Sequence, residues 1–401
     1  MRYEGKVRQP RHTCAKGVHT IDSVELIATA TFGLESVVAR EVQALGYDTD
    51  VANTRVTFKA GLEAICRTNL WLRSADRVLV KLGEFTALSF DELFERTKAL
   101  PWADWLPANA NFPVNGKSIK SKLFSVPDCQ AIVKKAVVES LKSRYHCQWF
   151  EETGPRFTIE VALLKDIATL TIDTSGPGLH KRGYRKLSSA APLKETLAAA
   201  MINLSRWHPE RMLLDPLCGS GTIPIEAALI GLDIAPGIHR EFAAGQWPIV
   251  PERLWQEARQ EARDLIRRDL KLQLRGTDID AEVLSLARYH ARQAGVAEQI
   301  SWQQAPLAEL HTKQKYGYII CNPPYGERME DIQSAEHLYQ EMGQVFRPLG
   351  TWSFYVLTAH HGFEKLFGRR ADKKRKLYNG RIECNYYQFF GPRPPRPNLE
   401  A

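Results

Sequence analysis

Four consecutive residues, Asn322-Pro323-Pro324-Tyr325, are the strongest candidates for a chemical site in this sequence. They follow the apolar run 318–321, which predicts a short buried strand. Two prolines end the pairing of that strand and fix the backbone after it. The strand tip then offers an amide side chain, a backbone carbonyl and an aromatic ring, which suit a planar group carrying an NH2. The alternative is a plain strand followed by a Pro-Pro turn, and an upstream donor site would decide between them.

A glycine-containing loop upstream is a candidate for that donor site. Asp215 ends a predicted strand, Thr222 begins a predicted helix, and the loop between them contains Pro216, Cys218, Gly219, Ser220 and Gly221. Its glycines permit positive φ and close approach of a ligand, and the first N–H groups of the helix point at that ligand. The loop lacks the Gly-Lys-[Ser/Thr] of a triphosphate loop and the full glycine pattern of a dinucleotide site. A turn shaped by geometry alone is the alternative.

Acidic residues follow the next predicted strand, at Asp278-Ile279-Asp280. We expect Asp278 to accept the hydroxyls of a ribose, as acids at this position do in nucleotide-binding folds. Asp280 is then the N-cap of the next helix or a second polar contact, and two simple caps are the alternative. Asp278 lies 57 residues after Gly221 (278 − 221), compared with about 20 in dinucleotide sites. Residues 233–270 are therefore expected to be an insertion, helical around 251–270.

The elements that position these residues are strands alternating with helices from 193 to 390. This order predicts an α/β fold with a mostly parallel, doubly wound sheet, and 382–390 is expected as its final edge strand. Upstream, 24–85 has the order βαββαβ of a ferredoxin-like unit, and a second α/β segment follows to about 173.

Composition and charge indicate the class of protein and of partner. The 401 residues are enough for two or three domains, and 44% hydrophobic with 25% charged residues is typical of soluble proteins. No apolar stretch could span a bilayer, residues 1–20 lack the apolar core of a secretory signal, and seven scattered cysteines include no C-x-x-C. We therefore expect a reduced, cytoplasmic protein without membrane or metal.

The net charge of +8 is concentrated in three clusters: 1–20 (+4), 181–186 (+4) and 365–376 (+6). Such clusters favour a polyanionic partner, although a solvated surface is the alternative for each one.

Together, the three strand tips resemble the class I S-adenosylmethionine-dependent methyltransferases. The whole chain from about 24 to 390 is similar to bacterial THUMP-domain RNA methyltransferases, related to enzymes that form N2-methylguanosine in large-subunit ribosomal RNA. The segments that carry this resemblance are 178–185, 191–197, 215–222 and 322–328.

The resemblance implies a domain order. It comprises a disordered basic tail (1–22), a ferredoxin-like domain (23–86), a THUMP RNA-binding domain (65–174), a linker (175–190), a Rossmann-like catalytic domain (191–392) and a tail (393–401).

The resemblance also implies roles at the site. Asn322 and the Pro323 carbonyl would accept hydrogen bonds from the NH2, beside Pro324, and Tyr325 would stack on the base. No acid follows the third strand, so Gln304 or the backbone at Ala305 must recognise the cofactor adenine. The implied S-adenosylmethionine contacts are Lys194, Glu195, Asp215, Pro216, Cys218, Gly219, Ser220, Gly221, Thr222, Asp278, Ile279, Asp280, Gln304, Ala305 and Asn322.

Among the cationic residues, the candidates for contact with RNA, ribosomal RNA in particular, are Lys134, Lys135, Lys181, Arg182, Arg185, Lys186, Lys374 and Arg375. Guanine N2 is the expected methyl acceptor. The Asn-Pro-Pro-Tyr motif also occurs in enzymes that methylate adenine N6 or a protein glutamine, so these alternatives stay open, although the N-terminal half favours RNA. A non-catalytic RNA-binding assembly factor is a further alternative, and the intact loop, Asp278 and Asn322 argue against it.

Overall fold

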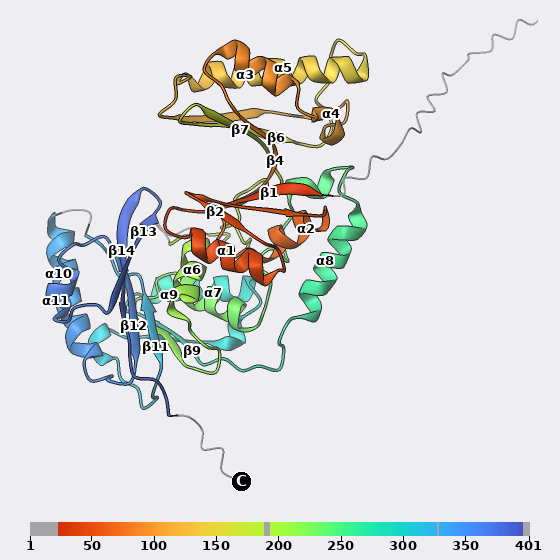
Figure 1. The fold of residues 1–401 in the computed structure, drawn as a ribbon. Coiled ribbons are helices and arrows are strands. Elements are labelled where there is room, and N and C mark those ends of the chain that lie inside the picture. The colour runs from red at the N-terminus through yellow and green to blue at the C-terminus, as the bar shows by residue number, and fades with distance from the viewer. Residues whose placement is uncertain (1–22, 188–192, 327–328, 396–401) are drawn as a thin grey trace, which may run out of the picture.

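The computed structural model describes residues 23–187, 193–326 and 329–395, and it contains two seven-stranded sheets (Figure 1). The expected tail 1–22 and residues 396–401 of the expected C-terminal tail lie outside these ranges. Within the described residues, no helix combines the length and the apolar character needed to cross a membrane.

The first sheet has the strand order β2-β3-β1-β4-β7-β6-β5. Strand β4 pairs with β1 through its first residues and with β7 over a longer stretch, with a bulge between Lys81 and Gly83. One strand thus makes a continuous sheet from the ferredoxin-like and THUMP parts. The bounds are β1 (Val24–Thr29), β2 (Asp50–Ala52), β3 (Arg55–Ala60), β4 (Arg77–Thr86), β5 (Val114–Ile119), β6 (Thr158–Leu164) and β7 (Ile167–Asp173).

Amphipathic helices cover this sheet. The ferredoxin-like order is confirmed by α1 (Glu35–Ala44) and α2 (Glu63–Trp71), and the THUMP part contributes α3 (Phe90–Lys98), α4 (Trp102–Trp105) and α5 (Val126–Tyr145). The Ser89 hydroxyl caps helix α3 by accepting the Glu92 N–H (3.2 Å), and the Glu92 carboxylate accepts the N–H of Leu88 (2.7 Å), one residue before the N-cap. Figure 1 places α3 and α5 on the side of the sheet away from the second sheet.

The second sheet has the order β10-β9-β8-β11-β12-β14-β13. Its first five strands are parallel, and the β13–β14 hairpin adds antiparallel to β12. This confirms the mostly parallel sheet. The bounds are β8 (Leu213–Asp215), β9 (Leu274–Asp278), β10 (Ile300–Gln304), β11 (Tyr318–Cys321), β12 (Ser353–Thr358), β13 (Lys373–Asn379) and β14 (Ile382–Phe389).

The predicted edge strand is wrong. Strand β14 lies inside the sheet, and β13 forms the edge. The sequence of β13, KKRKLYN, lacks the apolar alternation that predicts a strand. Its cations suit an edge strand, because charged side chains there discourage pairing with another chain.

Helices cover both faces of the second sheet. The core on one face contains side chains of α6 (Glu195–Ser205), α7 (Thr222–Gly231) and α9 (Ala281–Gln293). The core on the other face contains those of α10 (Met329–Phe346) and α11 (Phe363–Phe367), which makes the sheet doubly wound.

The insertion at 233–270 connects the two halves of the chain. It contains the expected helix, α8 (Glu252–Asp264), which lies against α2 (Figure 1). Phe242, Trp247 and Trp255 belong to the N-terminal core rather than to the cores of the second sheet. The Trp247 ring stacks on Phe157 with 4.5 Å between centroids, and its indole N–H donates to the Arg156 carbonyl at 3.0 Å.

Candidate active site

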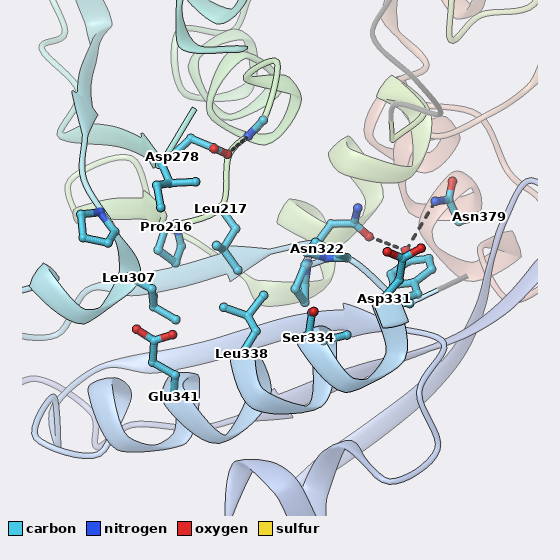
Figure 2. Close-up of a pocket in the computed structure, with 18 of the residues that line it drawn as sticks. Pro216, Leu217, Asp278, Leu307, Asn322, Asp331, Ser334, Leu338, Glu341 and Asn379 are labelled. Carbon is cyan, nitrogen blue, oxygen red and sulfur yellow. Dashed lines mark hydrogen bonds between the residues drawn. The ribbon is translucent and has the colours of Figure 1, made fainter. Parts of the chain in front are cut away.

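A cavity of about 740 Å3 opens at the carboxyl ends of β8, β9 and β11 (Figure 2). In a parallel sheet these ends meet at one edge, which is where such folds bind ligands. The residues of three predicted motifs meet here. Those that line the cavity are Pro216, Gly219, Asp278, Ile279, Ala305, Asn322, Pro323, Pro324 and Tyr325.

Asp278 is held by backbone amides at the end of β9. Its carboxylate accepts the Gly219 N–H at 2.9 Å and the Asp280 N–H at 3.1 Å. Gly219 has φ +51°, and a Cβ built on it would meet no atom within 4 Å, so the loop backbone is open at this point. Asp280 does not line the cavity; its carboxylate caps α9 by accepting the N–H groups of Glu282 and Val283. The N-cap interpretation of Asp280 is therefore the one that its contacts support.

The other loop residues that were expected to touch the cofactor do not line the cavity. Gly221 has φ +84°, and a Cβ there would lie 2.6 Å from the Trp302 ring, so packing requires this glycine. Cys218 and Ser220 are buried, and the Thr222 hydroxyl accepts a hydrogen bond from Arg185.

Asp215, at the end of β8, is buried under the loop and does not line the cavity. Burial raises the pKa of its carboxyl group well above the usual range, and the negative charge of Asp278 raises it further, against the opposing hydrogen bond from the Leu217 N–H (3.2 Å). The interior beneath the loop thus favours the neutral acid.

Two tyrosine hydroxyls hold the Asn322–Tyr325 turn. The Tyr339 hydroxyl donates to the Pro324 carbonyl at 2.6 Å and bonds the Thr358 hydroxyl at 2.9 Å. The Tyr325 hydroxyl donates to the Asn322 side-chain oxygen. This contact uses one of the two lone pairs of the Asn322 amide oxygen, which leaves the other able to accept a further hydrogen bond.

The end of β10 contacts the cavity through apolar groups. Gln304 donates its amide to the Ile279 carbonyl at 3.0 Å and does not line the cavity. The Ala305 N–H donates to the Asp278 carbonyl at 3.0 Å and is therefore already used. The Gln304 side chain thus points one amide N–H at the backbone, and the cavity surface here consists of Ile279, Ala305, Pro306 and Leu307.

Lys194 and Glu195 do not line the cavity either. Lys194 is the N-cap residue of α6, and the buried Glu195 pairs with Arg185 at 3.3 Å. Glu195 is connected to the loop through Arg185, because Arg185 also donates a hydrogen bond to the Thr222 hydroxyl.

The expectation that Arg182 contacts RNA is wrong. Its guanidinium is buried and pairs with the buried Glu226 carboxylate at 3.3 Å, and it also donates to the Leu179 carbonyl at 2.7 Å. Arg185 is similarly committed to internal partners. A charge run in the sequence does not reveal that two of its members face inward. Lys181 and Lys186 are exposed, and they stay candidates.

The other cationic candidates lie away from the cavity. Lys134 pairs with Glu152 at 2.6 Å and lies 3.5 Å from the centre of the Phe112 ring, and Lys135 is exposed beside Phe94. Lys374 pairs with Glu364 at 2.8 Å. Arg375 donates to Gly33 and Ser36 across the contact between the two halves of the chain.

Sequence reasoning missed one wall of the cavity. It is formed by α10, whose lining residues Asp331, Ser334, Ala335, Leu338 and Glu341 recur at the three- and four-residue spacing of one helix face (Figure 2). This spacing is visible in the sequence and indicates a helix with one face of its own, which could have identified the wall. Asn379 and Ile382, from the β13–β14 turn, complete the wall beside Tyr325, and Asn379 donates to the Tyr325 hydroxyl at 3.4 Å.

We expect Asp215→Asn to stabilise the protein, increasingly so as pH rises. The pKa of Asp215 is higher in the folded than in the unfolded state. At a pH above the unfolded-state pKa, unfolding therefore releases a proton, and raising the pH destabilises the folded wild type. Thermal unfolding of both proteins between pH 4 and pH 8 measures the difference. A difference in melting temperature that does not change with pH would contradict the burial argument.

Comparison with protein families gives three consecutive matches. Residues 25–79 match the RlmL ferredoxin-like domain, 87–173 match the THUMP domain, and 182–388 match the RMKL-like methyltransferase domain. The chain is 50% identical over 378 residues to the Bacillus subtilis protein named "Putative RNA methyltransferase YpsC", covering 94% of this chain and 98% of that protein.

Solved structures agree with these matches. A Listeria monocytogenes protein described as a predicted N6-adenine-specific DNA methylase is 53% identical with a TM-score of 0.89, covering 92% of this chain and 97% of that one. The crystal structure of SMU.472 in complex with SAH is 47% identical with a TM-score of 0.89, covering 93% of this chain and 100% of that one. The chain therefore belongs to the RMKL-like methyltransferase family, with the ferredoxin-like and THUMP domains in front of the catalytic domain.

Proposed function

We propose that this protein transfers a methyl group from S-adenosylmethionine to the exocyclic N2 of a guanine in RNA, with large-subunit ribosomal RNA as the substrate. In this proposal residues 65–174 bind RNA and residues 191–392 perform the transfer in the cytoplasm. The observation that carries the proposal is the meeting of Asp278, Asn322 and Asp331 in one cavity.

The cavity suits a cationic cofactor. Its lining includes three carboxylates, Asp278, Asp331 and Glu341, and no Lys, Arg or His among the described residues. Asp278 would accept the ribose hydroxyls, and the apolar surface around Ala305 would hold the adenine. When bound, the cofactor supplies a methyl group already activated by the sulfonium. The SAH complex of SMU.472 supports this assignment.

The acceptor would be positioned by the turn after β11. The Asn322 side-chain oxygen and the Pro323 carbonyl accept hydrogen bonds, so they orient an NH2 group. The lone pair of an exocyclic amine is delocalised, so fixed orientation is the main contribution that the protein must make.

Asp331 favours guanine over adenine. Guanine presents N1–H beside its N2 amine, and a carboxylate accepts from that donor. Adenine presents an acceptor at N1, which a carboxylate repels. The acceptor side of the cavity therefore matches the donor pattern of guanine better than that of adenine.

Two observations on relatives bear on the substrate. The ferredoxin-like and THUMP matches and the name of the Bacillus subtilis relative favour RNA. The description of the Listeria relative names adenine N6 in DNA, which keeps that reaction as the second candidate. The two products, N2-methylguanosine and N6-methyladenosine, are separable by mass spectrometry of nucleosides.

Asp278→Ala is expected to weaken S-adenosylmethionine binding by about 10- to 100-fold, because hydrogen bonds to a charged group contribute about 1.5–3 kcal/mol. Isothermal titration calorimetry measures this. Asp280→Ala is the matched control, since it removes a helix cap outside the cavity and should leave the affinity unchanged. Equal effects of both substitutions would remove Asp278 from the cofactor site.

Asn322→Ala should lower methyl transfer by on the order of 100- to 1000-fold, as loss of a preorganised hydrogen-bonding group does, while cofactor binding is retained. In a strain that lacks the gene, N2-methylguanosine should be lost from ribosomal RNA. The wild type should restore it, and Asn322→Ala should not. Restoration by the variant would exclude Asn322 from the reaction, and the loss of N6-methyladenosine instead would establish the adenine alternative.

Asp331→Asn tests the choice of base. The amide retains the shape of the carboxylate but weakens the interaction with guanine N1–H, so we expect kcat/KM on ribosomal RNA from the deletion strain to fall at least tenfold. Glu298→Gln, which neutralises an exposed carboxylate outside the cavity, is the control and should retain activity on that RNA. An unchanged rate for Asp331→Asn would assign the base preference to other groups.

A further inference from the structure

A second cavity, of about 910 Å3, lies between α1, the end of α6 and the starts of β11 and β12. It shares no lining residue with the candidate active site. We call it the basic groove, because five cations line it: Arg40, Arg206, Lys373, Arg375 and Arg393.

The positive charge of the basic groove is uncompensated. Its lining contains no Asp or Glu, and within the described part of the chain none of its five cations has a carboxylate within 4.0 Å. Two neighbouring carboxylates have other partners. Glu35 accepts the N–H groups of Gly33 (2.9 Å) and Thr54 (3.1 Å). Asp372 accepts from the Phe390 N–H (2.7 Å) and from Arg369 (3.2 Å). A concave, unneutralised set of cations attracts a polyanion.

Arg375 is held at the wall of the groove. Its Nε donates to the Gly33 carbonyl at 2.9 Å and one terminal nitrogen donates to the Ser36 hydroxyl at 2.8 Å. Burial lowers the pKa of Arg375, and repulsion from the nearby Arg40 lowers it further, against the opposing charge of Glu35. An anion between the two guanidinium groups would relieve this repulsion.

The groove also offers aromatic surface. The Phe390 side chain, which lines it, is 48% exposed. The Tyr318 ring stacks on the buried Tyr355, with 6.0 Å between centroids and 11° between planes. Cations combined with exposed rings are the features with which proteins bind single-stranded nucleic acid. An RNA duplex is instead recognised over its wide minor groove, which does not require a cavity.

Strand β13 connects the basic groove to the candidate active site. Lys373, at its start, lines the groove, and Asn379, at its end, lines the active-site cavity. Six residues of extended strand span about 20 Å. A few nucleotides bridge that distance, so one RNA strand can occupy both places.

We propose that the basic groove binds a single-stranded segment of the RNA substrate, with phosphates on its five cations and a base stacked on Phe390. This inference rests on the proposed RNA methyltransferase function and extends it to a surface formed jointly by the ferredoxin-like part and the catalytic sheet.

The test compares two triple variants of the full-length protein. Arg40→Gln/Lys373→Gln/Arg393→Gln removes three cations from the groove. Arg267→Gln/Lys271→Gln/Arg292→Gln removes three exposed cations elsewhere. Fluorescence anisotropy with a labelled 12-nucleotide oligouridine measures affinity between 50 and 300 mM KCl. Each lost phosphate contact reduces the slope of log affinity against log salt by about 0.7, so the groove variant should lose about 2 units of slope and roughly 100-fold in affinity at 100 mM salt.

The outcomes separate this proposal from the proposed function. Wild-type affinity and slope in the groove variant would overturn the groove assignment, even if N2-methylguanosine is formed. Loss of affinity in that variant would support the groove, even if another base proves to be methylated. Polyglutamate binding is measured in the same way. If the groove variant loses affinity for polyglutamate but keeps its affinity for RNA, the groove binds an acidic protein and the proposal is overturned.

Phe390→Leu tests the stacking contribution separately, because leucine retains an apolar side chain but has no ring face. We expect oligouridine affinity to fall about fivefold or more with an unchanged salt slope. Wild-type affinity in this variant would overturn the stacking part of the proposal.

Discussion

The parallel pairing of β8 with β9 and β11 is the constraint on which the rest of the structure depends. Strand β8 has three residues, and both neighbours align on it, β9 through Leu274 to Gly276 and β11 through Tyr318 and Ile319. This alignment brings the chain after each strand to one edge. The cavity exists there because Gly219, Asp278 and Asn322, which are distant in sequence, all lie at or just after the ends of strands that run in the same direction.

The two halves of the chain are coupled through buried polar contacts as well as through the core. Arg182, in the segment after the first sheet, binds Glu226 of α7 and also donates to the Arg73 carbonyl of the ferredoxin-like part. Breaking one partner of such a pair leaves an unpaired buried charge, which costs about 3–5 kcal/mol. Together with the insertion that packs Trp247 on Phe157, these contacts favour a fixed placement of the N-terminal sheet relative to the cavity.

The sequence allowed the fold class and the centre of the site to be predicted, because both depend on local signals. A strand, a glycine turn and an acid are each encoded within a few residues, as at Gly219 and Asp278. Other features depend on partners that are distant in the sequence. Glu226 makes Arg182 an internal residue, and Trp302 explains Gly221. The wall formed by α10 required knowledge of which helix face turns inward, and β13 lacks the apolar alternation that identifies a strand.

The two cavities differ in electrostatic character, and under the proposed function they would bind different parts of one RNA substrate. The candidate active-site cavity is lined by carboxylates, which repel phosphates; under the proposed function they would accept the donors of a guanine and suit a cationic cofactor. The basic groove has the opposite character. A nucleotide whose base enters the first region must leave its phosphates outside, because their charge is unfavourable there. Strand β13 extends from one region to the other, so under the proposed function the rest of the RNA strand would follow a cationic surface, and separate residues would select the base and bind the backbone.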